Sequence, residues 1–206
     1  HWPYTPLLPP TGRPVSTAAA LRRLQWELGG ARWPLLRDAV NAQGVRLTAD
    51  ELSSITALYD GEIHDVDAAL ASLIELLRGR GLLDRPLLVV TADHGEGFLD
   101  HGLLDHGYGP YDELLRIPLL LRFPRAADGG RRVPGPVQIV DIAPTIVDYL
   151  GIDAPAPGGR SLLAAIAGES PRDDDDVIAE EVHGSITMTA LRTSRYKYLR
   201  IEDDDA

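Results

Sequence analysis

Two continuous apolar runs constrain the fold of this chain most strongly. The first, LLVV at 87–90, follows Pro86, and the second, IPLLLRFP at 117–124, contains Pro118 and ends in Pro124. Strands with one wet face alternate apolar and polar residues, whereas unbroken apolar runs of this length are typical of strands buried on both faces. We therefore expect two interior strands of a sheet that is covered on both faces.

Helical patterns flank these runs. TADE at 48–51 is a capping box and predicts a helix from about Asp50 to Arg78. Apolar residues recur there every three or four positions, which predicts one buried stripe; its members are Leu52, Ile55, Tyr59, Ile63, Val66, Leu70, Leu73 and Leu77. Residues 16–40 predict two short helices. The segment 137–151 predicts a short strand and then a helix with Asp141 as N-cap and Gly151 at its end, and 159–168 predicts a turn and another short helix.

The last part of the chain has the alternating pattern of strands instead of helical patterns and apolar runs. VIAEEV at 177–182, ITMTALRT at 186–193 and RYKYLRI at 195–201 alternate in the manner of strands and predict an antiparallel meander. The expected fold is α/β, a layered sheet with helices on both faces, followed by a small C-terminal antiparallel α+β appendage. We expect residues 1–168 to form the α/β part and residues 169–206 to begin the antiparallel subdomain.

Composition excludes several classes of function. The net charge of −11 argues against nucleic-acid binding, which needs a basic surface. It also requires a bound cation and local histidine or arginine if the substrate is an anion. The chain has no cysteine, so disulfides and thiolate chemistry are excluded within it, and no apolar run has the length of a membrane span. Because the chain opens with His1 inside HWPY, we expect it to be a piece of a longer protein.

Histidines crowd the segment that follows the first apolar run. Residues 91–107, TADHGEGFLDHGLLDHG, hold three of the six histidines, each directly after an aspartate. Asp93 and His94 stand where the strand ends, which is where open α/β sheets bind ligands. A carboxylate beside an imidazole suits a divalent cation. The alternative is that Asp93 caps the next turn and that His94 is a half-buried histidine with its hydrogen bonds satisfied.

Two further histidines follow in the same segment. Imidazole can ligate a metal, donate to an oxyanion or act as general acid toward a leaving oxygen. His101 and His106 are each followed by glycine, so the loop can lie close to a surface and present them inward. For His101 the alternative to a role in the site is a purely structural one, in which its hydrogen bond stabilises the conformation of the loop.

These residues carry a resemblance to a known family. VVTADHGEGFLDHGLLDHGYGPYDELLRIPLLLRFP at 89–124 resembles the C-terminal metal-binding signature of the sulfatases and their relatives in the alkaline phosphatase superfamily. The likeness extends to residues 59–77, 137–152, 159–168 and 190–200, and HWPY is similar to a family segment of the form PHxPY. It implies an alkaline phosphatase-like fold, of which this chain would supply the later part of the catalytic domain.

The resemblance also implies roles for individual residues. Asp93 and His94 would be metal ligands, and His1 and His106 would contact the substrate anion. His106 stands where many relatives place a lysine, so it would be the catalytic donor to the leaving oxygen, while His101 would order the loop or support the site from behind. The implied metal is Ca²⁺, with Mn²⁺ as the alternative because imidazole nitrogen suits manganese better than calcium.

The implied activity is metal-dependent hydrolysis of a sulfate ester, on a small molecule or a carbohydrate. The alternatives are a phosphodiesterase or phosphonate monoester hydrolase of the same superfamily, and a non-catalytic module that binds metal or anionic glycan. The family's nucleophile motif, Cys/Ser-x-Pro/Ala-x-Arg, does not occur in the chain. Formylglycine is therefore expected only in a segment upstream, and residues 1–206 alone are expected to be inactive.

Overall fold

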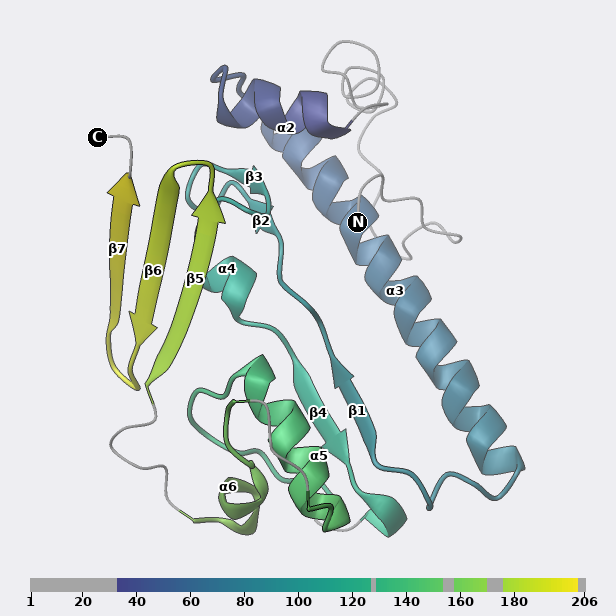
Figure 1. The fold of residues 1–206 in the computed structure, drawn as a ribbon. Coiled ribbons are helices and arrows are strands. Elements are labelled where there is room, and N and C mark those ends of the chain that lie inside the picture. Colours follow the sequence, from purple (N-terminus) through teal and green to yellow (C-terminus); the bar gives the residue numbers. More distant parts are fainter. Residues whose placement is uncertain (1–32, 127–128, 154–157, 170–175, 204–206) are drawn as a thin grey trace. The chain divides into compact units, whose positions relative to one another are not determined.

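The structure, a computed structural model, describes residues 33–126, 129–153, 158–169 and 176–203. His1 and the first of the two predicted short helices lie outside these residues. The described residues form two compact units, each considered by itself (Figure 1). The first unit contains the described residues up to His106 together with Glu113–Arg125, and the second contains Gly107–Asp112 and the described residues from Ala126 onward. The domain boundary after residue 168 stays a prediction.

Two helices begin the first unit. Helix α2 spans Trp33–Asn41, the second of the two predicted short helices. Helix α3 spans Ala49–Gly79, and its capping box forms as predicted. The backbone N–H of Glu51 donates to Thr48 Oγ1 at 3.3 Å, and the backbone N–H of Thr48 donates to Glu51 Oε2 at 2.7 Å. Two of the amides that no helical carbonyl can satisfy are thereby paired at the N-terminus of α3.

A small apolar core lies between α2, the first half of α3 and the histidine-rich segment. Four buried aliphatic side chains form its centre: Leu36, Val40, Ile55 and Leu104. The rings of Tyr59 and Phe98 pack edge to face beside them, with centroids 5.1 Å apart. Since full burial of one such side chain contributes roughly 1.5–3 kcal/mol, this core holds the segment that follows β1 against the helices.

The second half of α3 departs from the prediction. The apolar stripe is buried at Ile55, whereas the side chains of Ile63 and Val66 are 52% and 66% exposed, and Leu73 is exposed too. The described core gathers around the N-terminal turns of α3 only. The prediction of one stripe buried along the whole helix is therefore wrong within the described part of the chain.

The two apolar runs form strands that pair with each other. Strand β1 spans Leu88–Thr91 and β4 spans Leu119–Arg122, and they run antiparallel (Figure 1). In their register Val89 lies opposite Leu121. The strands themselves are confirmed. Burial on both faces is not found among the described residues, because Leu120 is 59% exposed and β1 and β4 have only each other as sheet neighbours there.

The histidine-rich segment contains a short ribbon that the sequence did not predict. Strand β2, Gly97–Phe98, pairs with β3, Leu104–Asp105, with Gly97 opposite Asp105. The side chain of Asn41 in α2 binds both backbone groups of Leu104: Nδ2 donates to the carbonyl at 2.8 Å, and Oδ1 accepts from the N–H at 2.9 Å. These two bonds fasten the ribbon to α2.

Two helices of the second unit are joined through one buried carboxylate. Helix α5 spans Ile142–Leu150 and ends at Gly151 as predicted, and α6 spans Leu163–Ala167. A 3₁₀ turn, Ile139–Asp141, stands where a short strand was expected. Asp141 precedes α5, but its carboxylate caps no amide of that helix; it accepts from the backbone N–H of Gln138 and of Arg160, each at 2.9 Å. The carboxylate thus serves the loop before α6, because the neighbouring 3₁₀ turn and that loop both present amides to it.

The predicted meander is confirmed. Strands β5, β6 and β7 span Val177–His183, Ile186–Arg192 and Lys197–Asp203 and form an antiparallel sheet in that order. Short connections at 184–185 and 193–196 fix the register, which pairs Ala179 with Ala190 and Ala190 with Leu199. Among the described helices, none combines the length and the apolar character needed to cross a bilayer.

Candidate active site

The chain turns sharply immediately after β1. Gly95 follows Asp93 and His94, and its N–H donates to the carbonyl of Leu114 at 2.8 Å. A Cβ on Gly95 would lie 1.9 Å from the carbonyl oxygen of Glu113, so no other residue fits without movement of the backbone. The close approach fixes the turn that carries Asp93 and His94.

Asp93 presents a well-exposed carboxylate at this turn. Its side chain is 75% exposed, and Oδ1 accepts a hydrogen bond from the backbone N–H of His94 at 3.0 Å. That hydrogen bond, followed by the amide of Asp93 itself and the charge of His94, holds the pKa of the carboxyl below its ordinary value. Asp93 is therefore an anion at neutral pH and can ligate a cation.

His94 is oriented by the backbone. Its Nδ1 lies 2.7 Å from the carbonyl oxygen of Gly95, and a carbonyl oxygen can only accept, so Nδ1 carries a proton. In the neutral ring the lone pair is then on Nε2, which lies 3.7 Å from Asp93 Oδ2. An imidazole whose other nitrogen donates to a backbone carbonyl is the usual arrangement of a metal-ligating histidine. One oxygen and one nitrogen at this separation fit a single divalent cation.

Both interpretations of Asp93 and His94 from sequence describe part of this geometry. The turn-capping contact uses Oδ1 of Asp93, and the backbone contact of the ring uses Nδ1 of His94. The atoms that would ligate a cation are the other two, Oδ2 and Nε2. Local hydrogen bonding and metal ligation are therefore compatible in the same pair.

His106 lies directly beside His94. The two ring centroids are 4.0 Å apart with an angle of 31° between the planes. The β2–β3 ribbon accounts for this approach, since it folds the chain back on itself and returns residue 106 to the turn after β1. The structure thus brings together the predicted metal ligands and the predicted substrate donor, which are separated by 12 positions in the sequence.

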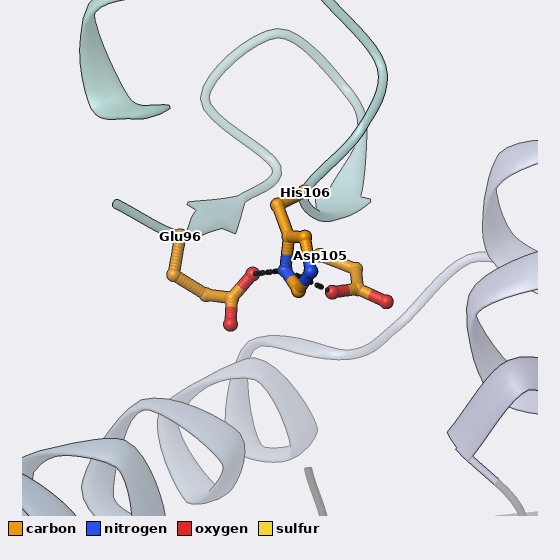
Figure 2. Close-up of side chains that lie close together, drawn as sticks. All are labelled: Glu96, Asp105 and His106. Carbon is orange, nitrogen blue, oxygen red and sulfur yellow. Dashed lines mark hydrogen bonds and ion pairs between the residues drawn. The ribbon is translucent and has the colours of Figure 1, made fainter. Parts of the chain in front are cut away.

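Two acidic residues that sequence reasoning did not single out complete the surroundings of His106. Glu96 Oε1 lies 3.2 Å from His106 Nδ1, and Asp105 Oδ1 lies 2.7 Å from the same nitrogen (Figure 2). Their ligand atoms and the imidazole nitrogen all lie within 4.8 Å of one another, close enough to hold a metal ion. Pairing of residues 97 and 105 in a hairpin was the signal that could have identified Glu96, because it places residue 96 opposite residue 106.

The two carboxylates differ from Asp93 in their burial. The side chain of Glu96 is 7% exposed and that of Asp105 is 5% exposed. Arg37 Nη1 lies 3.8 Å from Asp105 Oδ2 and offsets part of the negative charge. Burial, and after it the nearby charge of Glu96, raises the pKa of Tyr59. The phenol therefore stays neutral beside these acids.

His101 occupies a different part of the segment. Its Nδ1 lies 2.6 Å from Glu113 Oε1, and its side chain is half exposed. The turn around it is closed by hydrogen bonds from the N–H of Leu99 to the carbonyl of Leu103 and from the N–H of Gly102 to that of Leu99. The contact with Glu113 is of the kind that orders a loop. The predicted role of His101, to order the loop or support the site from behind, stays a prediction, and so does substrate contact by His1, which lies outside the described residues.

Comparisons with known proteins agree with the resemblance seen in the sequence. A family model described as Sulfatase matches residues 10–152. Arylsulfatase K of Mus musculus is 30% identical over 168 residues, which cover 77% of this chain and 30% of the relative. The multifunctional alkaline phosphatase superfamily protein PehA of Trinickia caryophylli is 35% identical over 133 residues, covering 63% of this chain and 26% of PehA. The chain thus spans less than a third of the length of these relatives.

A solved structure supports the same fold. The phosphonate monoester hydrolase of Agrobacterium radiobacter superposes with a TM-score of 0.66 and 29% identity, over 76% of this chain and 36% of that protein. This likeness confirms the predicted α/β, alkaline phosphatase-like class. The three-stranded C-terminal sheet is the predicted antiparallel appendage.

Proposed function

Because the chain belongs to the sulfatase family, we propose that it forms part of a divalent-metal-dependent hydrolase of sulfate esters. Asp93 and His94 would ligate the cation, and His106 would contact the transferred group or the leaving oxygen. The observation that carries this proposal is the packing of the His94 and His106 rings, with centroids 4.0 Å apart. This contact puts His94, one of the two proposed ligands, beside His106, the proposed donor.

The residues of this chain have distinct tasks in the proposed reaction. Asp93 Oδ2 and His94 Nε2 would hold the cation, which would supply stabilisation of the negative charge on the transferred group. As an imidazolium, His106 donates its Nε2 proton to the leaving oxygen and keeps its Nδ1 proton, because the carboxylates of Glu96 and Asp105 lie beside Nδ1. A positioned acid of this type typically accelerates a reaction about 10²–10⁴-fold. The nucleophile would come from a part of the protein that precedes this chain.

The proposed cation is Ca²⁺, as the family resemblance implies. Calcium takes roughly six to eight oxygen ligands, so further carboxylates or carbonyls would have to join Asp93. The nitrogen of His94 suits Mn²⁺ better, which keeps manganese as the alternative. The proposed substrate is a sulfate ester of a small molecule or a carbohydrate.

A phosphonate or phosphate ester is the second candidate substrate. The observation in its favour is the 29% identity to a phosphonate monoester hydrolase, together with the 35% identity to PehA. Both ester classes present an anionic tetrahedral group that could be held by the same cation and the same donor. The two candidates differ in the charge and size of that group.

One experiment separates these candidates. The complete gene product is purified, stripped of metal and assayed with 4-nitrophenyl sulfate and 4-nitrophenyl phenylphosphonate, each with added Ca²⁺ or Mn²⁺. We expect kcat/KM to be higher for the sulfate ester and to depend on added metal. A higher value for the phosphonate would establish the second candidate, and metal binding without turnover of either ester would establish a non-catalytic module.

A further inference from the structure

We propose that Glu96 and Asp105 are positioning residues for His106. They hold one of the two protons of the imidazolium on Nδ1, so that the other proton, on Nε2, is the one donated to the substrate, and the neutral ring that remains keeps its proton on Nδ1. The inference rests on the proposed function, in which His106 donates to the transferred group or to the leaving oxygen.

Both acids lie close to the same nitrogen of His106, Nδ1. Glu96 Oε1 is hydrogen-bonded to His106 Nδ1 at 3.2 Å, and Asp105 Oδ1 lies 2.7 Å from the same atom (Figure 2). An ionised carboxylate can only accept, so Nδ1 must be the donor. In a histidine, the partner of one ring nitrogen decides what the other nitrogen can do. The two acids therefore assign the substrate-facing role to Nε2.

The two acids are buried more deeply than the imidazole that they contact. Glu96 and Asp105 are 7% and 5% exposed, whereas the side chain of His106 is 34% exposed. The acids thus lie on the protein side of the ring and leave about a third of it accessible. A carboxylate buried in this way is held in one place by packing, as a group that orients another side chain needs to be.

The backbone around Asp105 is closely packed. Gly97 lies opposite Asp105, and a Cβ on Gly97 would be 2.8 Å from the Asp105 carbonyl oxygen, so the two strands of the ribbon are in close contact. Asp105 adopts a left-handed conformation with φ 81°, which costs free energy in any residue other than glycine. Asn41 holds the neighbouring Leu104 by both backbone groups. The pairing with Gly97 and the hold on Leu104 therefore fix the backbone of Asp105, from which its carboxylate projects.

A cation between Glu96, Asp105 and His106 is the competing interpretation. Ligand atoms about 2.0–2.2 Å from one metal lie roughly 2.8–3.1 Å from each other at octahedral angles and roughly 3.3–3.6 Å at tetrahedral angles. The 2.7 Å between Asp105 Oδ1 and His106 Nδ1 is shorter than this. Arg37, at 3.8 Å from Asp105 Oδ2, already supplies positive charge to the cluster. The geometry therefore favours an ion pair over a second metal site.

Double-mutant cycles on the complete gene product test the proposal. Glu96→Gln and Asp105→Asn are made alone and combined with His106→Ala; the amides keep the shape of the acids, and asparagine tolerates the left-handed backbone. We expect each single change to lower kcat about 10–100-fold with little change in KM, as for partners that orient a functional imidazole. The loss should be larger for phenyl sulfate than for 4-nitrophenyl sulfate, whose leaving group needs less protonation. In the His106→Ala background the same changes should cost less than about twofold.

Glu113→Gln is the matched control, because it removes the carboxylate paired with His101 in the same segment. Its effect should be the same with or without His106→Ala. Equal losses from Glu96→Gln and Asp105→Asn in both backgrounds would mean that the acids only stabilise the fold, and the inference would be wrong. If His106→Ala itself leaves kcat unchanged, the proposed function loses its donor, which is a separate outcome.

A spectroscopic measurement makes the inference testable without turnover. Histidine side-chain ¹H–¹⁵N correlation spectra distinguish a proton on Nδ1 from a proton on Nε2. We expect neutral His106 to carry its proton on Nδ1 in the wild type and to shift toward the Nε2–H form in the Glu96→Gln/Asp105→Asn variant. A wild-type spectrum with neutral His106 protonated on Nε2 would overturn the inference whatever the activity.

Discussion

Asp93 and His94 divide their polar atoms between the backbone and the site. Asp93 Oδ1 and His94 Nδ1 bind backbone groups of the turn, while Asp93 Oδ2 and His94 Nε2 face each other at 3.7 Å. The backbone contacts hold each side chain in one orientation before any cation arrives. Preorganisation of this kind reduces the entropy lost on binding.

Asp93→Asn should lower metal affinity and turnover together, because the substitution removes one charged ligand atom and leaves the shape of the side chain intact. Excess metal should restore only part of the activity. Calorimetric titration with Ca²⁺ and Mn²⁺, alongside kcat measurements, checks this. Asp100→Asn is the control, since Asp100 also precedes a histidine but accepts from the N–H of Phe98 at 3.2 Å. Full metal occupancy and full rate in Asp93→Asn would remove this residue from the site.

Gly95→Ala should disrupt the turn that carries both ligands. The added Cβ would lie 1.9 Å from the Glu113 carbonyl oxygen, so the backbone has to move. Overpacking of this kind costs about 1–3 kcal/mol, and we expect lower thermal stability together with weaker metal binding. Gly79→Ala is the control, because a Cβ there meets nothing within 4 Å at the end of α3. Similar melting temperatures for the two variants would contradict this account.

At the scale of elements, one carboxylate within the second unit, that of Asp112 at the start of α4 (Asp112–Leu115), pairs with two cations of the C-terminal sheet. Asp112 Oδ2 pairs with Arg192 Nη1 and Oδ1 pairs with Lys197 Nζ, each at 2.7 Å. Arg192 in β6 and Lys197 in β7 are register partners, so both cations reach the same acid. The hydrogen bond from Lys197, and then that from Arg192, holds the pKa of Asp112 below its ordinary value.

Asp112→Asn should destabilise the protein at neutral pH and have little effect in acid. A lowered pKa in the folded state stabilises the fold above the unfolded pKa of about 3.9, and this contribution is lost as pH falls through the folded pKa. Because Asp112 is half exposed, we expect no more than about 1 kcal/mol per ion pair. Urea unfolding at pH 7 and at pH 3 checks this, with the exposed Asp153→Asn as control. A difference from wild type that is the same at both pH values would contradict it.

At the scale of the whole molecule, the charge of −11 opposes an anionic substrate, so the site must reverse the local field. Asp93 adds to the negative charge, and the carboxyl groups of Glu96 and Asp105 lie beside His106. In the proposed function, a bound cation together with the histidine rings would attract the anionic group of the substrate.

Residues 1–206 alone should hydrolyse neither sulfate nor phosphate esters. The sequence contains no Cys/Ser-x-Pro/Ala-x-Arg motif to supply the nucleophile, and Asp93 and His94 provide two of the several ligands that a hard cation requires. We expect metal binding in about the millimolar range for the isolated chain and tighter binding for the complete gene product. Calorimetry and an ester hydrolysis assay on both proteins check this. Micromolar binding with turnover by residues 1–206 would show that they contain the whole site.

The sequence by itself determined α3, the strands β1 and β4 to β7, and the position of the candidate ligands. The capping box placed the start of α3, the apolar runs gave β1 and β4, and alternation gave β5 to β7, because each of these patterns is local. The Asp-His pair at the end of β1 followed from the same local logic. These predictions needed only the periodicity of side chains along the backbone.

Only the tertiary structure decided which partners each group meets. Glu96 and Asp105 acquire their place at His106 through the β2–β3 ribbon and its attachment to α2, contacts that span up to 63 positions. Asp141 was expected to cap α5 but binds amides of the 3₁₀ turn and of the loop before α6. The prediction that the second half of α3 is buried was wrong, because an apolar stripe shows only that one face of a helix is suited to burial. It does not show that another element packs against that face. What covers a face, and which carboxylate meets which imidazole, depends on residues distant in sequence, and no local pattern contains that information.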